Sequence, residues 1–187
     1  MSKLSIRNSN LLVESSGLAT IEFAIASSVL MLGLLNGLET ARYSFQKMEV
    51  ANAVHAAAHA AWNACDTKHL PALSKCTTVN TAINNGIQST SLGSAVTLST
   101  TTVSGKTVSY PFEGYYCLTT AGALKKEADY TGTKPTDCSA EGDSAHTPGD
   151  YLVIKAQATY APLFSSKLTI GSLFGTTLSA TSTIRLQ

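Results

Sequence analysis

The stretch "SSGLATIEFAIASSVLMLGLLNGLE", residues 15–39, decides the fold of this chain because it is its most apolar run. Between residues 21 and 38, Glu22 is the only charged residue and Asn36 is the only amide. A helix over this interval is about 27 Å long, which is close to the thickness of the hydrocarbon core of a membrane. The run therefore predicts a transmembrane helix, with bounds near residues 18–41.

Two other structures can contain a similar run. One is the buried core helix of a soluble protein, although so little polarity over this length favours a membrane span. The other is a secretory signal peptide, whose apolar region is usually about 7 to 15 residues long and precedes a small-residue cleavage site. The run here is longer, and no convincing A-x-A site follows it directly. Lys3 and Arg7 precede the run and Arg42 and Lys47 follow it, so charge does not predict the orientation.

The helical pattern continues beyond the apolar run. Residues 39–65 contain neither proline nor glycine and are rich in alanine, the strongest helix former. We therefore expect one helix over residues 18–64, with a helix extension over 42–64 outside the lipid. Apolar positions recur at steps of three and four, which predicts that one face of this extension is buried. The expected face comprises Phe45, Met48, Ala51, Asn52, Val54, His55, Ala58 and Trp62.

Four cysteines, all after the apolar run, indicate the compartment of the C-terminal region. An even number of cysteines on one side of a membrane segment favours two disulfides in an oxidising compartment. Of the three possible pairings, we favour the sequential one, Cys65–Cys76 and Cys117–Cys138, because it closes two short loops. Zinc ligation is the alternative, but the chain has no C-x-x-C and its cysteine spacings fit no common zinc finger. The cysteines thus predict that residues 42–187 lie outside the cytoplasm.

The region after the helix predicts a small antiparallel sheet and an α+β fold. Residues 65–77 form a loop bracketed by cysteines, and residues 77–89 have the pattern of a short helix. From residue 93 the apolar period changes to two, which is typical of strands. The expected strands are residues 94–105, 106–120 with an interruption at Pro111, 151–164 and 176–187, and a long loop spans 120–149. We expect the helix extension to pack on one face of this sheet, at about residues 93–187.

Small residues within the apolar run indicate a place for another helix. Gly33 and Gly37 form a G-x-x-x-G pattern, which lets a second helix approach closely. Asn36 lies beside them and has two open interpretations. Its amide can hydrogen-bond between helices, or it can simply lie near the outer membrane interface.

The start of the run resembles the processing site of type IV pilin-like proteins. In that superfamily a membrane peptidase cuts after a glycine, and the fifth residue of the mature chain is glutamate. Gly17, Leu18 and Glu22 have this spacing. More closely, residues 16–45 resemble the TadE-like family of minor pilins or pseudopilins of tight-adherence (Tad/Flp) pili. The features that match are Gly17, the Glu22–Phe23 pair, the apolar run, a helix continuing through Glu39 and Arg42, and a final strand of the type "LSATSTIRL".

The resemblance implies a prepilin-type leader over residues 1–17, removed by a prepilin peptidase between Gly17 and Leu18. It further implies assembly with other pilin subunits and the inner-membrane pilus machinery, with the C-terminal domain in the periplasm or in an extracellular pilus. Two features depart from the pattern. Leu18 stands where mature type IV pilins usually begin with phenylalanine, and TadE-like chains often lack cysteines.

Glu22 has a physical reason to take part in assembly. Cleavage after Gly17 creates an α-amine at Leu18 with a pKa near 8, which is cationic at neutral pH. A carboxylate held in lipid needs a partner, and this amine, from the same or a neighbouring subunit, supplies one. Such a pair sets the axial register between subunits, with Phe23 beside it. The alternative is that Glu22 extends to the inner headgroups, since it lies only one turn into the run.

Other functional classes have little support in the sequence. The charged fraction is 13%, against about a quarter in ordinary proteins, and the net charge of +1 gives no indication of a nucleic-acid partner. His55 and His59 lack the glutamate of a zinc protease motif, and no nucleotide-binding or hydrolase motif occurs. The acidic residues Asp137, Glu141, Asp143 and Asp150 lack EF-hand spacing, so calcium is not favoured.

We therefore expect a structural protein with no enzymatic activity, no metal and no cofactor. The alternative function is an unprocessed, membrane-anchored periplasmic domain that binds a ligand or partner through residues 120–149.

Overall fold

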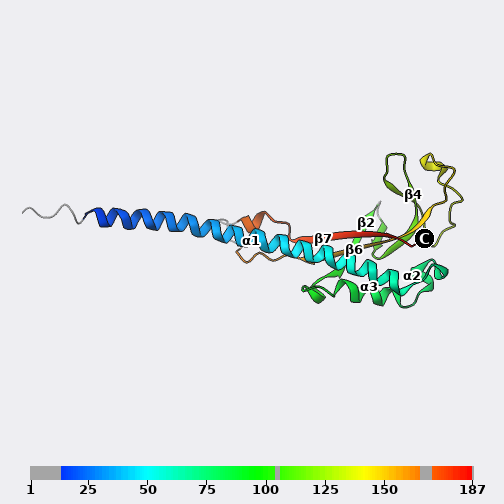
Figure 1. Cartoon of the computed structure of the whole chain (residues 1–187), viewed down its shortest axis with the longest axis horizontal. Helices are drawn as coiled ribbons and strands as arrows, with labels where there is room; N and C mark the ends of the chain where they lie inside the picture. The colour runs from blue at the N-terminus through cyan, green and yellow to red at the C-terminus, as the bar shows by residue number, and fades with distance from the viewer. Residues whose placement is uncertain (1–13, 104–105, 165–169, 187) are drawn as a thin grey trace, which may run out of the picture. The chain divides into compact units, whose positions relative to one another are not determined.

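The computed structural model describes residues 14–103, 106–164 and 170–186. The predicted leader therefore lies outside the described residues except for its last four. The longest element is α1 (Glu14–Ala64), a single helix that begins before Gly17 and ends where the sequence predicted (Figure 1). The chain divides into two compact units, one comprising the residues up to Ala41 with Pro162–Phe174, the other Arg42–Ala161 with Gly175–Gln187.

The second unit contains an antiparallel sheet of five strands. Strand β6 (Gly149–Thr159) is its centre and pairs with β7 (Thr177–Arg185) over most of its length. The opposite edge of β6 is shared by β1 (Thr97–Leu98) and β4 (Phe112–Leu118), and β5 (Leu124–Asp129) pairs with β4. The helix and the sheet confirm the predicted α+β class and the antiparallel pairing.

The first two predicted strands are wrong in detail. Residues 97–109 form β1, β2 (Thr100–Val103) and β3 (Lys106–Ser109), and β2 and β3 make a separate two-stranded sheet. The break falls at the buried Ser99, whose amide donates to the Lys155 carbonyl and whose carbonyl accepts from the Tyr110 amide. Ser99 thus ends the pairing with β6 and closes the base of the β2–β3 hairpin.

Strand β5 lies in the segment 120–149 that the sequence predicted to be a loop. Its sequence, LKKEAD, shows no alternation of apolar and polar residues, because it lies at the edge of the sheet with most side chains exposed or half-exposed. The strand is held by its pairing with β4, and Lys126 and Asp129 form an ion pair within the strand. Conversely, β6 ends at Thr159, five residues before the predicted strand end at 164.

Short helices connect α1 to the sheet. The predicted loop 65–77 contains two of them, η2 (Thr67–His69) and α2 (Ala72–Lys75). The helix predicted over 77–89 is α3 (Val79–Ile87), and η3 (Gly93–Ala95) precedes β1. Two further short helices lie elsewhere: η4 (Ser139–Glu141) in the segment between β5 and β6, and η5 (Ile170–Leu173) between β6 and β7 in the other unit. Two disulfides, Cys65–Cys76 and Cys117–Cys138, give the sequential pairing, and the second holds segment 120–149 to β4.

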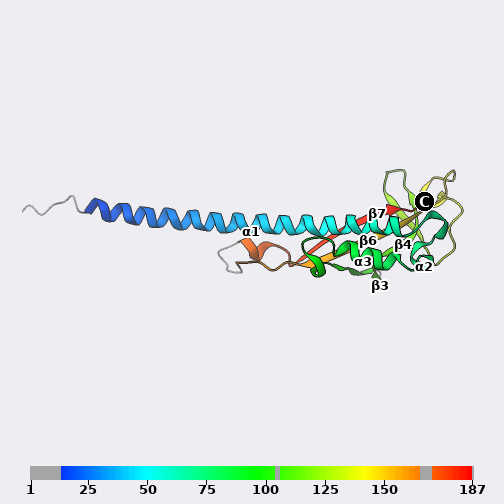
Figure 2. The same cartoon turned by 60° about the horizontal axis from the view of Figure 1, so that its bottom comes forward.

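The buried face of the helix extension consists of alanine and valine and agrees only in part with the predicted face. Val54 and Ala58 are buried as predicted, but Phe45, Met48 and Trp62 are exposed. The close approach of α3 explains the difference, since α3 runs beside the C-terminal half of α1 in both views (Figure 2). A Cβ atom on Gly86 of α3 would lie 2.5 Å from the Ala57 Cα atom, so only small side chains fit. The buried residues of α1 here are Val50, Ala53, Val54, Ala57, Ala58 and Ala61.

Much of the rest of the core comes from α3 and from one face of β6. Burial alternates strictly along β6, as expected for a strand with one covered face. The apolar residues buried on these two elements are Val79, Ile83, Ile87, Leu152, Ile154, Ala156 and Ala158. At the start of β6 the buried face carries a carboxylate, Asp150, instead of an apolar side chain.

Candidate functional site on the N-terminal helix

The first half of α1 presents a continuous apolar surface. All of residues 17–34 are exposed, including Phe23, of which 74% is accessible. The most apolar window of this helix has a mean hydropathy of 2.0, and none of it is buried. By length and composition, α1 is the one helix among the described residues that can cross a membrane.

The polar side chains of this half are bonded to their own helix. Ser27 donates to the Ala24 carbonyl, and Ser28 reaches the carbonyls of Ala24 and Ile25. Such bonds satisfy hydroxyl groups without water, as hydrocarbon surroundings require. This half of the helix can therefore enter lipid without leaving these hydroxyls unpaired.

Glu22 differs from these serines because its carboxylate is exposed and pairs with none of the described residues. Leu18 and Glu22 are four residues apart and therefore share a face of α1. Gly17 and Leu18 both lie in helical backbone, within the first turns of α1. The structure thus brings the predicted cleavage site and the predicted register residues, Glu22 and Phe23, onto one exposed helical segment.

Gly33 and Gly37 lie on an open part of the helix surface. A Cβ atom placed on either glycine would meet nothing within 4 Å among the described atoms. Neither glycine is therefore required by the packing of this chain on itself. The surface that both leave open suits close approach by a second helix.

Asn36 has partners within its own chain. Its Nδ2 donates to the Leu32 carbonyl at 2.7 Å, and its Oδ1 accepts from the Ile170 amide at 2.7 Å. Of the two interpretations of the sequence, the hydrogen bond between helices is therefore the less supported. The Ile170 amide, which is 134 positions away, occupies the amide oxygen.

Glu39 is a buried carboxylate to which the sequence analysis assigned no role of its own. It is completely buried, and both of its carboxylate oxygens accept from the Leu163 amide at 3.2 Å. Its position directly after Leu38 is visible in the sequence, but its burial depends on a segment more than 120 residues later. Asn36 and Glu39 together fix Leu163 and Ile170 to the end of the apolar run.

A pair of buried carboxyl groups lies in the sheet domain. Glu113 on β4 accepts from the amides of Ala72 and Leu73 at 2.6 and 2.7 Å, and thereby holds α2 against the sheet. Burial raises the pKa of Glu113, and these two amides oppose the rise. Burial and the nearby Glu113 charge raise the pKa of Asp150 to about 6. This pair is a structural element with a pH-dependent charge.

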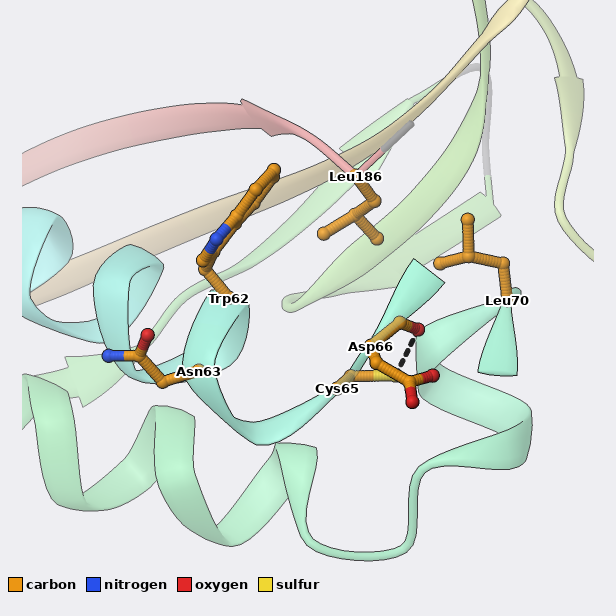
Figure 3. Close-up of a pocket in the computed structure, with 6 residues that line it drawn as sticks. All are labelled: Trp62, Asn63, Cys65, Asp66, Leu70 and Leu186. Carbon is orange, nitrogen blue, oxygen red and sulfur yellow. Dashed lines mark hydrogen bonds between the residues drawn. The ribbon is translucent and has the colours of Figure 1, made fainter. Parts of the chain in front are cut away.

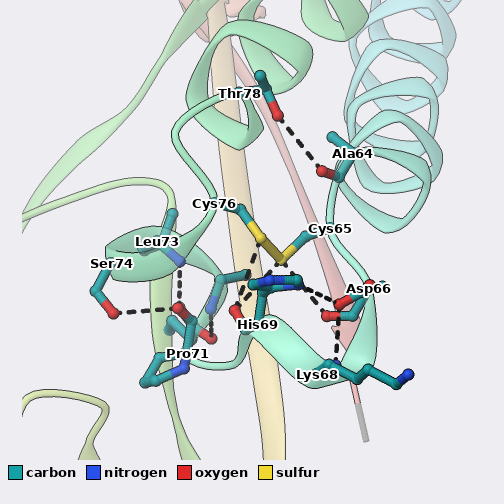
Figure 4. Close-up of a disulfide and its surroundings, with 12 residues drawn as sticks. Ala64, Cys65, Asp66, Lys68, His69, Pro71, Leu73, Ser74, Cys76 and Thr78 are labelled. Atoms are coloured by element: carbon teal, nitrogen blue, oxygen red, sulfur yellow. Dashed lines mark hydrogen bonds and ion pairs between the residues drawn. A yellow bond between two sulfur atoms is a disulfide. The ribbon is translucent and has the colours of Figure 1, made fainter.

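The end of α1 is fixed by the first disulfide. Cys65 directly follows α1, and its bond to Cys76 closes the loop that carries η2 and α2 (Figure 4). His69 and Asp66 form an exposed pair within this loop at 2.6 Å, and Thr78 donates to the Ala64 carbonyl. The loop therefore forms a compact cap on α1.

Two shallow grooves flank Trp62, which is half exposed. One, of about 390 Å³, is lined by Trp62, Asn63, Cys65, Asp66, Leu70 and Leu186 (Figure 3). The other, of about 470 Å³, lies between α1 and β7 and includes His55, His59 and Arg185. Nowhere in the described ranges do three His, Cys, Asp or Glu side chains come together as a metal site.

The acidic segment considered for calcium is occupied by local bonds. Asp137 accepts from the Ser139 amide, and Asp143 accepts from the Ala145 amide and pairs with His146 at 2.7 Å. Glu141 forms an ion pair with Lys125. Because these bonds keep the pKa of Asp137 and of Asp143 low, both side chains are charged and bonded at neutral pH.

Comparison with known proteins addresses the first half of α1 directly. The family model described as TadE-like protein matches residues 17–59, which confirms the resemblance and extends it further along α1. No curated protein and no solved structure matches the chain. The match supports a pilin-like protein associated with a Tad pilus, and the family is structural rather than enzymatic. Residues 17–59, which begin at the glycine of the predicted processing site, are thus a TadE-like segment.

Proposed function

We propose that this protein is a minor pilin or pseudopilin of a Tad (Flp) pilus or a related secretion system. In this proposal it is processed after Gly17 and assembles through the first half of α1. The observation that carries the proposal is the coincidence of the family match with the exposed helix. The match begins at Gly17, and the described apolar side chains that follow it are exposed up to Leu34.

Processing requires access to the bond between Gly17 and Leu18. A protease binds its substrate in an extended form, and this bond lies three residues after the first residue of α1. Helix ends open at little cost, so the first turn can unwind for the prepilin peptidase. Cleavage then leaves the Leu18 α-amine four residues from Glu22, on the same face of the helix.

Assembly uses two features of the exposed surface. The Glu22 carboxylate pairs with the Leu18 amine, within or between subunits, and this pairing sets the axial register because an unpaired charge in lipid is costly. Gly33 and Gly37, one turn apart, allow the helix of a neighbouring subunit to approach its backbone. The sheet domain supplies lateral or tip contacts.

The proposed location is the inner membrane, with residues 42–187 in the periplasm before assembly. The two disulfides support this orientation, because such bonds persist in oxidising compartments. The partners are the prepilin peptidase, the other pilin subunits and the inner-membrane assembly machinery.

The register role is tested by Glu22→Gln, expressed as the full chain in cells of a Tad-producing host. We expect normal cleavage and a loss of the protein from purified pili or from cross-linked subunit complexes. Glu49→Gln is the matched control because Glu49 lies on the same helix and bonds Ser91 within the chain. Normal incorporation of the Glu22 variant would contradict the register role. Retention of residues 1–17, with no association with pilus components, would favour the anchored binding domain.

A further inference from the structure

The connection between β6 and β7 has an unusual composition. Residues 162–174 read "PLFSSKLTIGSLF", with a single charged residue and several large apolar ones. Connections between antiparallel strands are usually short and polar, and those longer than about 12 to 15 residues are commonly functional. The described parts of this segment, 162–164 and 170–174, belong to the same compact unit as the first half of α1.

Two side chains of α1 hold this segment by its backbone. The Leu163 amide donates to both oxygens of Glu39, and the Ile170 amide donates to Oδ1 of Asn36. Asn36 lies in the last turn of the apolar run, which ends at Leu38, and Glu39 directly follows that run. At about 1.5 Å per residue, both acceptors lie within about 3 Å of Leu38 along the helix axis.

The attached segment exposes large apolar side chains at this level. Leu173 is 80% exposed and Leu163 is 55% exposed, and Leu34 and Leu38 on the same unit are also exposed. Exposed apolar surface of this kind marks a contact with another apolar surface. These leucines belong to the same unit as a helix that is apolar enough to cross a membrane, so lipid is the apolar surface that they would meet beside an inserted helix.

The attachment also offsets the desolvation cost of burying the Glu39 carboxylate. A carboxylate at the boundary of the hydrocarbon core is unfavourable unless hydrogen-bond donors replace its water. The Leu163 amide supplies such a donor, and the side chain of Glu39 is fully buried. The segment thus shields a charge at the depth where its own leucines can enter lipid.

We propose that the β6–β7 connection is a second membrane contact, which inserts Leu163 and Leu173 into the outer interface of the bilayer beside α1. This proposal rests on the proposed membrane insertion of α1. It assigns Asn36 and Glu39 as positioning residues for the contact. The contact limits how far the chain tilts or sinks while it resides in the membrane.

The test uses the single tryptophan of the chain. In the full-length Trp62→Phe protein, tryptophan is placed at one position per variant by Leu173→Trp, Leu30→Trp or Leu118→Trp. Leu30 reports on the span, and Leu118, exposed in the sheet domain, is the matched control. Each variant is placed singly in phosphatidylcholine nanodiscs, with and without bromine on the acyl chains near the headgroup. Far-ultraviolet circular dichroism and the two disulfides verify folding.

We expect brominated lipid to reduce the fluorescence of the Leu30→Trp and Leu173→Trp variants, while iodide in the water reduces only that of Leu118→Trp. If Leu30→Trp responds to lipid but Leu173→Trp responds only to iodide, the second contact is wrong and the span stands. If Leu30→Trp does not respond to lipid, the span itself is wrong. Shielding of Leu173→Trp from both quenchers would overturn the proposal in favour of a protein contact.

Discussion

The two halves of α1 share one helix but differ in what they bury. Residues 17–34 carry large apolar groups, and all of them are exposed. Residues 42–64 bury a stripe of alanine and valine, while the large side chains of Phe45, Met48 and Trp62 remain exposed. The first half has few partners within its chain, whereas the second is packed against α3 and the sheet.

The difference shows where each half obtains its stability. Burial of small residues in the second half permits the close approach of Gly86 to Ala57 and contributes to folding of the domain. Large exposed residues in the first half contribute nothing to folding of a single chain, and their burial must come from lipid or other subunits. Variants in the second half should therefore change stability, and variants in the first half should change insertion or assembly.

The largest expected effect comes from removing the disulfide that caps the second half. We expect Cys65→Ser with Cys76→Ser to lower the free energy of unfolding by about 3 kcal/mol, because the unfolded chain gains freedom in this loop. Urea unfolding of the full chain in detergent, followed by Trp62 fluorescence, measures it. The wild-type protein without reductant, in which both disulfides are intact, is the control. An unchanged midpoint would show that the cap does not support α1.

Gly86→Ala tests the close packing of the second half. The added methyl group meets the backbone of Ala57, which cannot shift without moving α1. We expect a loss of about 1–3 kcal/mol in the free energy of unfolding, typical of overpacking. The same urea experiment measures it. A stabilised variant, as expected from helix propensity alone, would contradict the packing described here.

Asp150→Asn tests the buried carboxyl pair and its dependence on pH. The pKa of Asp150 is raised from the ordinary 3.8 to about 6, so between these values the folded protein keeps a proton that the unfolded chain releases. Stability therefore falls as pH rises through this window and levels off above it. We expect the variant to lose most of this fall and to gain about 1–2 kcal/mol at pH 7.5. Urea midpoints from pH 4 to pH 8 measure it. A pH profile identical to wild type would contradict the assignment.

The smallest effect on stability is expected for Gly33→Ala in the first half. Space is open at this glycine, so the free energy of unfolding should change by less than about 0.5 kcal/mol. Cross-linking between subunits in membranes should nevertheless decrease, because the methyl group separates the helices. An unchanged cross-linking yield would remove Gly33 from the proposed interface.

Sequence patterns predict the helices and strands of this molecule that depend on local propensity and periodicity. The helix end at Ala64, the helix over Val79–Ile87 and the strand over Thr177–Arg185 follow from propensity and periodicity. Strand β5 could not be predicted this way, because an edge strand with exposed side chains has no apolar alternation. The buried face of α1 was predicted only in part, because periodicity identifies apolar positions but not which neighbour is close enough to require alanine. Val54 and Ala58 are buried as predicted, whereas the larger Phe45, Met48 and Trp62 are exposed.

The candidate site likewise has a local part, which the sequence predicts, and a long-range part, which it does not. The spacing of Gly17 and Glu22 is local, and the family match supports its interpretation. The roles of Asn36 and Glu39 depend on Ile170 and Leu163, which the sequence places far away. Only the fold reveals that the end of the apolar run holds the β6–β7 connection.

The central claim is that the first half of α1 becomes an assembly element by cleavage after Gly17. Its most direct test is the intact mass of the protein purified from membranes of cells with and without the prepilin peptidase. We predict a chain beginning at Leu18 in cells with the enzyme and a chain that retains residues 1–17 in cells without it. Residues 1–17 retained in both strains would contradict the claim.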